Sequence, residues 1–404
     1  MLKAVSSFLE FCYLVRRSVI SEDDILKVEN AIAEFHANRV AFDDVRPEGY
    51  SLPRQHSLVH YPLLIREFGA PNGLCSSITE SKHIKAVKEP WRRSSRYKAL
   101  GQMLLTNQRL DKLAAIHVNF QARGMLSGDD LEPEPPPLPS AAHDEDDDDG
   151  GAVDGAISAE VILAKRPSKL CCHIQMVISD QPPVCNIPQL AQGLADHFDI
   201  PNLPNYISRF LYELENPDLE IELDEVPLQD CPEPSGKVRV FPSAVAIYYA
   251  PSDKSGTRGM FRERIRAVES WRKGPARHDC VFVSQDSTLP GFRGYFIARV
   301  RLFMSITHRR FTHPCALVEW FSTVGNAPCP KTGMWMVEPD FNALGNPAMS
   351  LIHLDAVFRG AHLMGVAGQG QFIPRHLEFH NSLDAFRSYY VNKYIDHHAH
   401  EFAF

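Results

Sequence analysis

Apolar positions recur every three or four residues in the first part of the chain, which is the period of an amphipathic helix. Ser21, followed by Asp23 and Asp24, is a suitable N-cap for the second of these helices. Gly69 before Pro71 is a typical helix end. Helices are expected over residues 2–17, 22–40, 54–68, from about residue 80, and over 97–123, with a short strand near 74–78.

The pattern changes to short β-rich runs from Gly236 onward, separated by Gly, Pro and Asn. These runs are KVRVFPSAVAIYYA, HDCVFVS, GYFIARVRLFMSIT, CALVEWFS, GMWMVEP and SLIHLDAVF. Their spacing predicts a small antiparallel barrel or sandwich, interrupted by a helix over 260–272. A closing helix is expected over residues 383–394, with Phe386, Tyr389 and Tyr390 on its packed side.

Length and composition agree with a globular protein of more than one domain. The chain has 404 residues, of which 44% are apolar and 10% aromatic. This composition excludes collagen, coiled coil and wholesale disorder. The sequence lacks a continuous apolar run long enough to span a bilayer, so no membrane association is expected. Nine cysteines without a repeated short spacing argue against a secreted disulfide framework.

Charge divides the chain more sharply than the total of −8 suggests. Residues 1–125 hold 18 Lys and Arg against 13 Asp and Glu, whereas residues 126–160 hold 12 acids and no base. The acidic block combines Pro, Asp and Gly runs and has few residues able to form a core, which predicts a disordered linker over 127–158. It is read as a solvated spacer; the alternative is an acidic mimic of nucleic acid that competes for the basic segment before it.

That basic segment spans residues 80–123, where ten Lys and Arg face three acids. On a helix, Lys82, Lys85 and Lys88 would form one stripe, because they recur every three residues. Trp91, next to Arg92 and Arg93, adds an aromatic ring on which a base could stack. Such a stripe could neutralise several phosphates, although charge alone is equally compatible with an ordinary solvated helix face. The candidate DNA-binding residues are Lys82, Lys85, Lys88, Arg92, Arg93, Arg96 and Lys98.

Several clusters of His and Cys are candidate metal ligands, and none is assigned a metal. The four-residue spacing of His56 and His60 is compatible with metal binding, but no Glu lies between them. They are therefore expected to pack or to form hydrogen bonds. Adjacent cysteines on a strand point to opposite faces, which argues against a zinc site. The remaining clusters are Cys171, Cys172, His173 and Cys185, then His308, His313, Cys315 and Cys329, and finally His397, His398 and His400, for which a structural role is favoured.

The β-rich region carries three tryptophans, Trp271, Trp320 and Trp335. They could line a peptide groove or an aromatic cage. At strand spacing, tryptophans are more often core residues, and this is the favoured interpretation.

The segment LPRQHSLVHYPLLIREFGAPNGLCSSITESKHIKAVKEPWRR resembles the end of the catalytic domain of fungal Plavaka-type transposases, relatives of the CACTA DDE transposases. FLEFCYLVRR, YKALGQMLLTNQRLDKLAA and the terminal NSLDAFRSYYVNKYIDHHAHEFAF extend the resemblance. It implies an RNase H-like domain in which two Asp and one Glu hold two metal ions for DNA strand cleavage and joining. The residue that matches the third acid is Glu80, within Thr79-Glu80-Ser81-Lys82-His83.

The sequence departs from this family pattern upstream of Glu80. The first two acids should lie on strands, but the only Asp residues there are Asp23, Asp24, Asp43 and Asp44, in or beside helical segments. A single carboxylate cannot hold a metal pair. The expected protein is therefore an incomplete, transposon-derived chain without strand-transfer activity. No cofactor is expected, and Mg²⁺ or Mn²⁺ would bind only if a partner supplied the missing acids.

The expected fold class is α+β. It comprises a mostly helical, truncated RNase H-like part over 1–126, the linker over 127–158, a mixed segment over 159–235, and a β-rich domain with a closing helix over 236–404. The expected function is residual DNA binding in the nucleus, with DNA and a full-length transposase as partners. Two alternatives stay open: a protein–protein docking module formed by the β-rich domain, and a relic without function.

Overall fold

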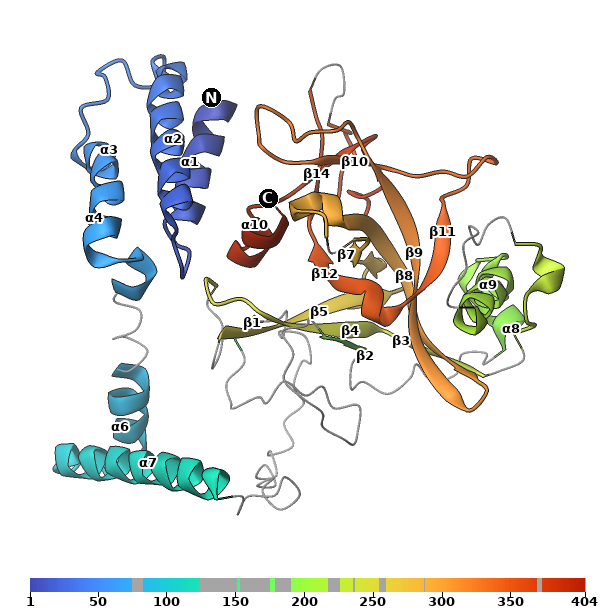
Figure 1. Ribbon diagram of the computed structural model, residues 1–404, viewed down its shortest axis with the longest axis horizontal. Helices are drawn as coiled ribbons and strands as arrows, with labels where there is room; N and C mark the ends of the chain where they lie inside the picture. The colour runs from blue at the N-terminus through green and yellow to red at the C-terminus, as the bar shows by residue number, and fades with distance from the viewer. Residues whose placement is uncertain are drawn as a thin grey trace. The chain divides into compact units, whose positions relative to one another are not determined.

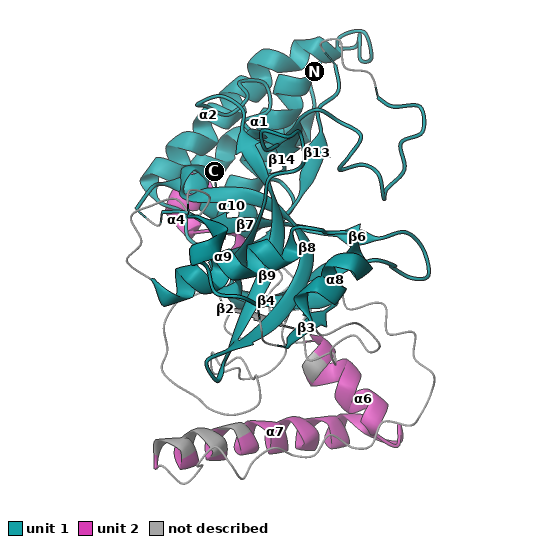
Figure 2. Cartoon of the chain, turned by 90° about the vertical axis from the view of Figure 1, so that its right-hand side faces the viewer, with its two compact units in different colours: residues 1–62, 146–404 teal, residues 63–145 magenta. Residues whose placement is uncertain are grey.

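The computed structural model describes most of the helical and β-rich parts of the chain. The residues that it describes are 1–74, 83–123, 151–152, 175–178, 190–216, 226–234, 237–253, 259–286, 288–368 and 373–403. The expected linker over 127–158 and the strand expected near 74–78 lie almost entirely outside these residues. Contacts divide the chain into two compact units, which Figure 2 colours separately. Unit 1 comprises residues 1–62 with 146–404, and unit 2 comprises residues 63–145.

Unit 1 begins with two helices that pack against each other, α1 (Leu2–Leu14) and α2 (Glu22–Asn38). The expected N-cap is confirmed: the Ser21 hydroxyl accepts a hydrogen bond from the Asp24 backbone N–H, and the Asp24 carboxylate accepts one from the Ser21 N–H. The helix expected over 54–68 is instead broken into short pieces. These are α3 (Pro53–His56), η2 (Ser57–His60) and α4 (Tyr61–Phe68), preceded by η1 (Arg39–Phe42).

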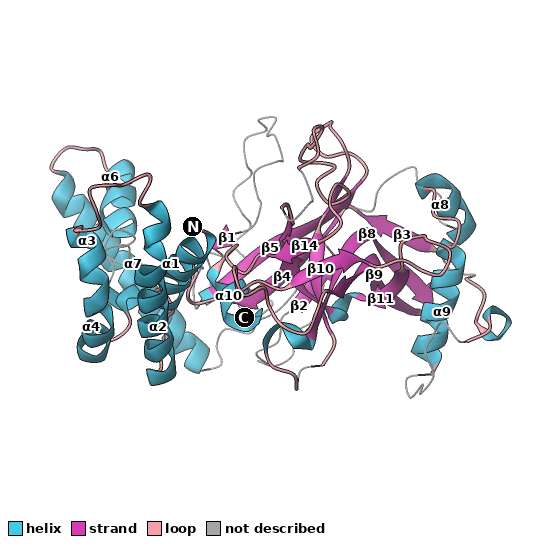
Figure 3. Cartoon of the chain, turned by 90° about the horizontal axis from the view of Figure 1, so that it is seen from above, coloured by secondary structure: helices cyan, strands magenta, loops and turns pink. Residues whose placement is uncertain are grey.

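The β-rich expectation is confirmed as two sheets whose described strand pairs are all antiparallel (Figures 1 and 3). The larger sheet is near-barrel in form and has the order β12-β7-β8-β9-β10-β14-β13, with β11 added beside β9 and β3 beside β8. Its strands are β3 (Val238–Phe241), β7 (Cys280–Ser284), β8 (Tyr295–His308), β9 (Phe311–Thr323), β10 (Met336–Pro339), β11 (Met349–His353), β12 (Val357–Ala361), β13 (Leu363–Gly365) and β14 (Tyr389–Val391).

The smaller sheet has the order β1-β5-β4-β2, with β6 beside β5. Its strands are β1 (Gly151–Ala152), β2 (Gln175–Ile178), β4 (Ser243–Tyr249), β5 (Met260–Val268) and β6 (Arg277–His278). The prediction of a helix over 260–272 is therefore wrong. In β5 the basic side chains of Arg262, Arg264 and Arg266 recur at every second position, which is the period of a strand.

Three apolar clusters form the core of unit 1. The first lies between the two sheets and includes Val281, Val300 and Phe303. The second joins the large sheet to helices α8 (Ala191–Phe198) and α9 (Leu203–Glu215), which Figure 3 shows beside the ends of β3, β8 and β11. The third surrounds Phe282 and includes residues of α10 (His397–Ala403).

The expected closing helix over 383–394 is also wrong in position. Residues 389–391 instead form β14, which pairs with β10 and β13. The helix near the C-terminus is α10, which contains the three histidines of the terminal cluster. All three are buried, and Arg359 Nη1 donates a hydrogen bond of 3.0 Å to His398 Nδ1.

Both ends of the chain meet within unit 1, where polar contacts fasten α1 to the C-terminal segment (Figure 1). Glu10 accepts hydrogen bonds from Lys393 Nζ at 2.7 Å and from the Tyr394 hydroxyl at 3.2 Å, and it lies 3.1 Å from His400 Nε2. The Ser6 hydroxyl adds a bond of 3.0 Å to the Thr332 carbonyl. The N-terminal helices are therefore an integral part of the β-rich unit.

All the regular elements among the described residues of unit 2 are helices. After α4 and η3 (Pro71–Leu74) come the π-helical turn η4 (Ile84–Lys88), α6 (Glu89–Arg93) and α7 (Ala99–Ala122). The long helix expected over 97–123 is confirmed by α7, whose Asn107 side chain donates a 2.8 Å hydrogen bond to the Ala86 carbonyl. No strand occurs in this described part, so an RNase H-like fold stays an expectation. None of the helices among the described residues has the length and apolar character needed to cross a membrane.

Candidate nucleic-acid interface

The basic segment of unit 2 forms a helical ridge followed by a tight turn. Its helical part, η4 and α6, ends at Arg93, and Ser94 leaves the helix in an extended conformation. The side chains of Lys88, Arg92 and Arg93 are all exposed. Lys88 and Arg92 stand four residues apart, so they lie on one face of the ridge. The helix expected in this segment is confirmed from residue 83 onward.

The turn between α6 and α7 presents two further cations through an unusual backbone. Arg96 and Lys98 have φ values of 65° and 45°, in the left-handed region that non-glycine residues rarely adopt. Gln102 of α7 stabilises this turn: its Nε2 donates to the Ser95 hydroxyl at 2.8 Å and to the Tyr97 carbonyl at 2.7 Å. The Ser95 N–H donates to Gln102 Oε1 at 3.0 Å. Held this way, both cationic side chains point outward and are exposed.

Two aromatic rings lie among these cations. Trp91 is 45% exposed and Tyr97 is 72% exposed, which is unusual for side chains that normally gain by burial. Lys98 Nζ lies 5.6 Å from the centre of the Tyr97 ring, within cation–π range. Exposed rings between exposed cations can stack with nucleic-acid bases.

Within the part of the chain that the structure describes, no ion pair joins the cations of this surface to a carboxylate. We define the basic–aromatic surface as Lys88, Arg92, Arg93, Arg96 and Lys98 together with Trp91 and Tyr97.

Three of the residues proposed from the sequence cannot be placed on this surface. Glu80, the family-matched acid, and Lys82 lie outside the described residues, and the side chain of Lys85 does as well. Sequence reasoning also missed how the turn is built. Gln102 is visible in the sequence, but only the fold shows that its side-chain amide forms hydrogen bonds with residues 95–97.

The remaining candidate clusters lie elsewhere. His56 and His60 pack edge to face, with ring centres 5.2 Å apart. No group of three or more potential metal ligands occurs within the described ranges. Cys171, Cys172, His173 and Cys185 lie outside them.

The three tryptophans of the β-rich region have different environments. Trp335 is buried and stacks on Phe292 at 5.2 Å, as expected for a core residue. Trp320 is partly buried, and its Nε1 donates a 2.8 Å hydrogen bond to the Ser350 hydroxyl. Trp271 instead lines a cavity at the surface of unit 1.

A scan of known protein families, a search of curated proteins and a search of solved structures each found no match. The surface must therefore be interpreted from its own chemistry.

Proposed function

We propose that this chain is a transposon-derived DNA-binding protein that contacts the phosphate backbone through the basic–aromatic surface of unit 2. The observation that carries the proposal is the set of five exposed cations without a described acidic partner, placed around two exposed aromatic rings. Backbone binding needs such cations, because each one that meets a phosphate releases a condensed counterion. The proposed contacts are with phosphates, which carry no sequence information directly, so binding with little sequence preference is expected.

The transposase resemblance supports the same conclusion from another direction. Plavaka-type enzymes act on DNA, and the segment that carries the resemblance includes the ridge of unit 2. It supplies only Glu80 of the three expected acids, so the proposal is binding without strand cleavage. Nuclear localisation, and association with DNA or with a full-length transposase, belong to the same proposal.

Charge reversal on the ridge tests this function. The full chain carrying Arg92→Glu and Arg93→Glu should lose at least two phosphate contacts and add repulsion, because both side chains lie on the exposed face. Its affinity for a fluorescein-labelled duplex, measured by anisotropy at low salt, should fall by at least tenfold.

The matched control carries Arg109→Glu and Lys112→Glu on α7. It makes the same change in net charge within the same unit, and both side chains are also exposed. An equal loss in both double variants would mean that net charge alone attracts DNA, and the assignment of the surface would be wrong. Unchanged affinity after reversal of Arg92 and Arg93 would also refute it.

A further inference from the structure

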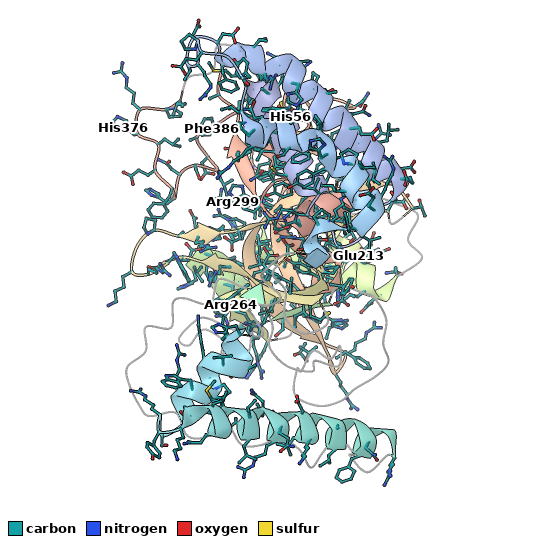
Figure 4. The ribbon with its side chains drawn as sticks, turned by 90° about the vertical axis from the view of Figure 1, so that its left-hand side faces the viewer. His56, Glu213, Arg264, Arg299, His376 and Phe386 are labelled. Atoms are coloured by element: carbon teal, nitrogen blue, oxygen red, sulfur yellow. The ribbon has the colours of Figure 1, made fainter. Side chains whose placement is uncertain are left out.

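The two aromatic rings of the basic–aromatic surface need a partner that phosphates alone do not provide. Trp91 follows Lys88 by three residues and precedes Arg92, so the indole and the two cations lie on neighbouring positions of the ridge. The Trp91 residue is 45% exposed. Figure 4 draws the side chains of α6 and α7 as sticks that project outward from the ribbon. A ligand that the cations attract can therefore reach this ring.

The second ring, Tyr97, is kept in solvent by a backbone that is costly to hold. Its two neighbours, Arg96 and Lys98, both have left-handed φ values. Such residues persist only where the surrounding structure fixes them, and they are typical of ligand-binding sites. Gln102 fixes this turn, because its Nε2 donates hydrogen bonds to the Ser95 hydroxyl and to the Tyr97 carbonyl. The outcome is a ring that is 72% exposed, although burial would stabilise it.

A further side chain connects the backbone that carries the two rings. The Ser94 hydroxyl donates a hydrogen bond of 2.8 Å to the Trp91 carbonyl and accepts one of 3.2 Å from the Arg96 N–H. Together with the bonds of Gln102, it joins the end of α6 to the turn before α7. Trp91 and Tyr97 are therefore carried by one connected turn, in a fixed order among the cations.

The bases of an intact duplex cannot use these rings. They are paired and stacked on one another, so a blunt duplex offers phosphates to the cations but no free base face to an aromatic side chain. An unpaired base exposes its face, and stacking on an aromatic ring is tolerant of base identity. DNA with unpaired bases would thus engage both the cations and the rings.

We propose that the basic–aromatic surface recognises DNA in which unpaired bases adjoin a duplex, as in a duplex with a single-stranded tail. Its cations would contact the phosphates, and Trp91 and Tyr97 would stack with the unpaired bases. This inference rests on the proposed DNA-binding function and names the class of DNA that the surface prefers. The preference concerns DNA structure and not sequence, because every base has a face on which a ring can stack.

The test compares two fluorescein-labelled DNAs that carry the same number of phosphates, a blunt duplex and a duplex with a short single-stranded tail. Charge alone would not favour the tailed DNA, because counterion release is larger for a duplex than for a single strand. The full chain should bind the tailed DNA at least about fivefold more tightly, as expected from one stacked base. Equal affinity, or tighter binding of the blunt duplex, would overturn this inference and leave the proposed function standing. Absence of binding to both DNAs would refute the proposed function instead.

Variants of Tyr97 test whether the ring produces the preference. Tyr97→Ala should weaken binding of the tailed DNA at least about fivefold and leave binding of the blunt duplex unchanged. Tyr97→Phe keeps the ring and should keep the preference. The matched control is Phe120→Ala, which removes another exposed ring of unit 2, on α7 and outside the surface. Retention of the preference by Tyr97→Ala, or an equal loss in Phe120→Ala, would contradict the inference.

Tryptophan fluorescence reports contact with the other ring. Trp91 is in unit 2, whereas Trp271, Trp320 and Trp335 are in unit 1, so the difference between the wild-type chain and Trp91→Phe isolates its signal. Stacking of a base on the indole should quench this difference signal when the tailed DNA is added, and the blunt duplex should leave it nearly unchanged. Equal quenching by both DNAs, or no quenching at saturating tailed DNA, would refute stacking on Trp91.

Discussion

The contact between Glu10 and the C-terminal segment makes a quantitative prediction about stability. Burial would raise the pKa of the Glu10 carboxyl, but the hydrogen bond with His400 and the charge of Lys393 outweigh it and lower the pKa to about 2. Relative to an ordinary value of 4.5, this corresponds to about 3 kcal/mol of stabilisation at neutral pH, at about 1.4 kcal/mol per pKa unit. Because the side chain keeps 29% exposure, we expect about 2–3 kcal/mol.

The perturbation is Glu10→Gln, which keeps the shape of the side chain and removes its charge. It also removes the ion pair between Glu10 and Lys393 Nζ, whose side chain is 9% exposed. The free energy of unfolding, measured by urea titration at pH 7, should therefore fall by about 2–3 kcal/mol. Tryptophan fluorescence suits the assay, because Trp271, Trp320 and Trp335 all lie in unit 1.

The direction of the Glu10 pKa shift determines how this stabilisation changes with pH. A carboxyl whose pKa is lowered by folding stabilises the fold above its unfolded pKa, and this contribution disappears as pH falls through the folded pKa. The difference between the wild-type protein and Glu10→Gln should be constant from pH 8 to about 5. It should lose more than half of its size by about pH 3.

The control is Glu48→Gln, since Glu48 is exposed and its substitution should change stability by less than about 0.5 kcal/mol. A loss below 0.5 kcal/mol for Glu10→Gln at pH 7, or a loss that stays the same down to pH 3, would refute the reasoning.

Three further predictions concern the core and the thiols. Arg359 is 1% exposed and forms two hydrogen bonds with Asp396. Asp396→Asn should therefore lower the free energy of unfolding of unit 1 by about 3 kcal/mol in urea titrations. A loss smaller than that caused by Glu48→Gln would contradict this prediction. A Cβ on Gly365 would clash with the Phe386 ring, so Gly365→Ala should lower the melting temperature. Gly101 lies in α7 with open space around it, so Gly101→Ala should raise the melting temperature or leave it unchanged. Burial raises the pKa of the Cys280 and Cys315 thiols. Burial acts in the same direction on Cys329, but hydrogen bonds, among them one with Tyr390, outweigh it and lower the pKa of that thiol. Iodoacetamide should therefore label Cys329 first among these three cysteines, as measured by peptide mass spectrometry.

Much of the fold could be predicted because local pattern and tertiary environment agree. The short apolar runs of β7, β8 and β9 are buried over most of their length, as expected for strands of a sheet covered on both faces, and the Ser21 capping box fixes the start of α2. Two of the failures share one cause. Residues 260–268 and 383–394 contain apolar residues three or four apart, which imitates a helix, but their pairing partners make strands of β5 and β14.

The candidate sites were predictable only in part. The cations of unit 2 are visible as a run in the sequence, so Lys88, Arg92 and Arg93 could be proposed directly. The cavity beside Trp271 could not be foreseen, since Arg266 and Arg277, whose guanidinium groups lie over the indole, come from different strands. In the sequence Trp271 is only one of three tryptophans of the β-rich region, and its surroundings in the fold distinguish it from the buried Trp335.

The salt dependence of duplex binding by the full chain tests the central claim most directly. If all five cations of the basic–aromatic surface meet phosphates, the logarithm of the association constant should fall against the logarithm of salt concentration with a slope of about −4.5. Affinity should then drop about 500-fold between 50 and 200 mM salt. The Arg92→Glu, Arg93→Glu variant should have a slope shallower by about 2. A slope near zero, or no binding at 50 mM salt, would contradict the account.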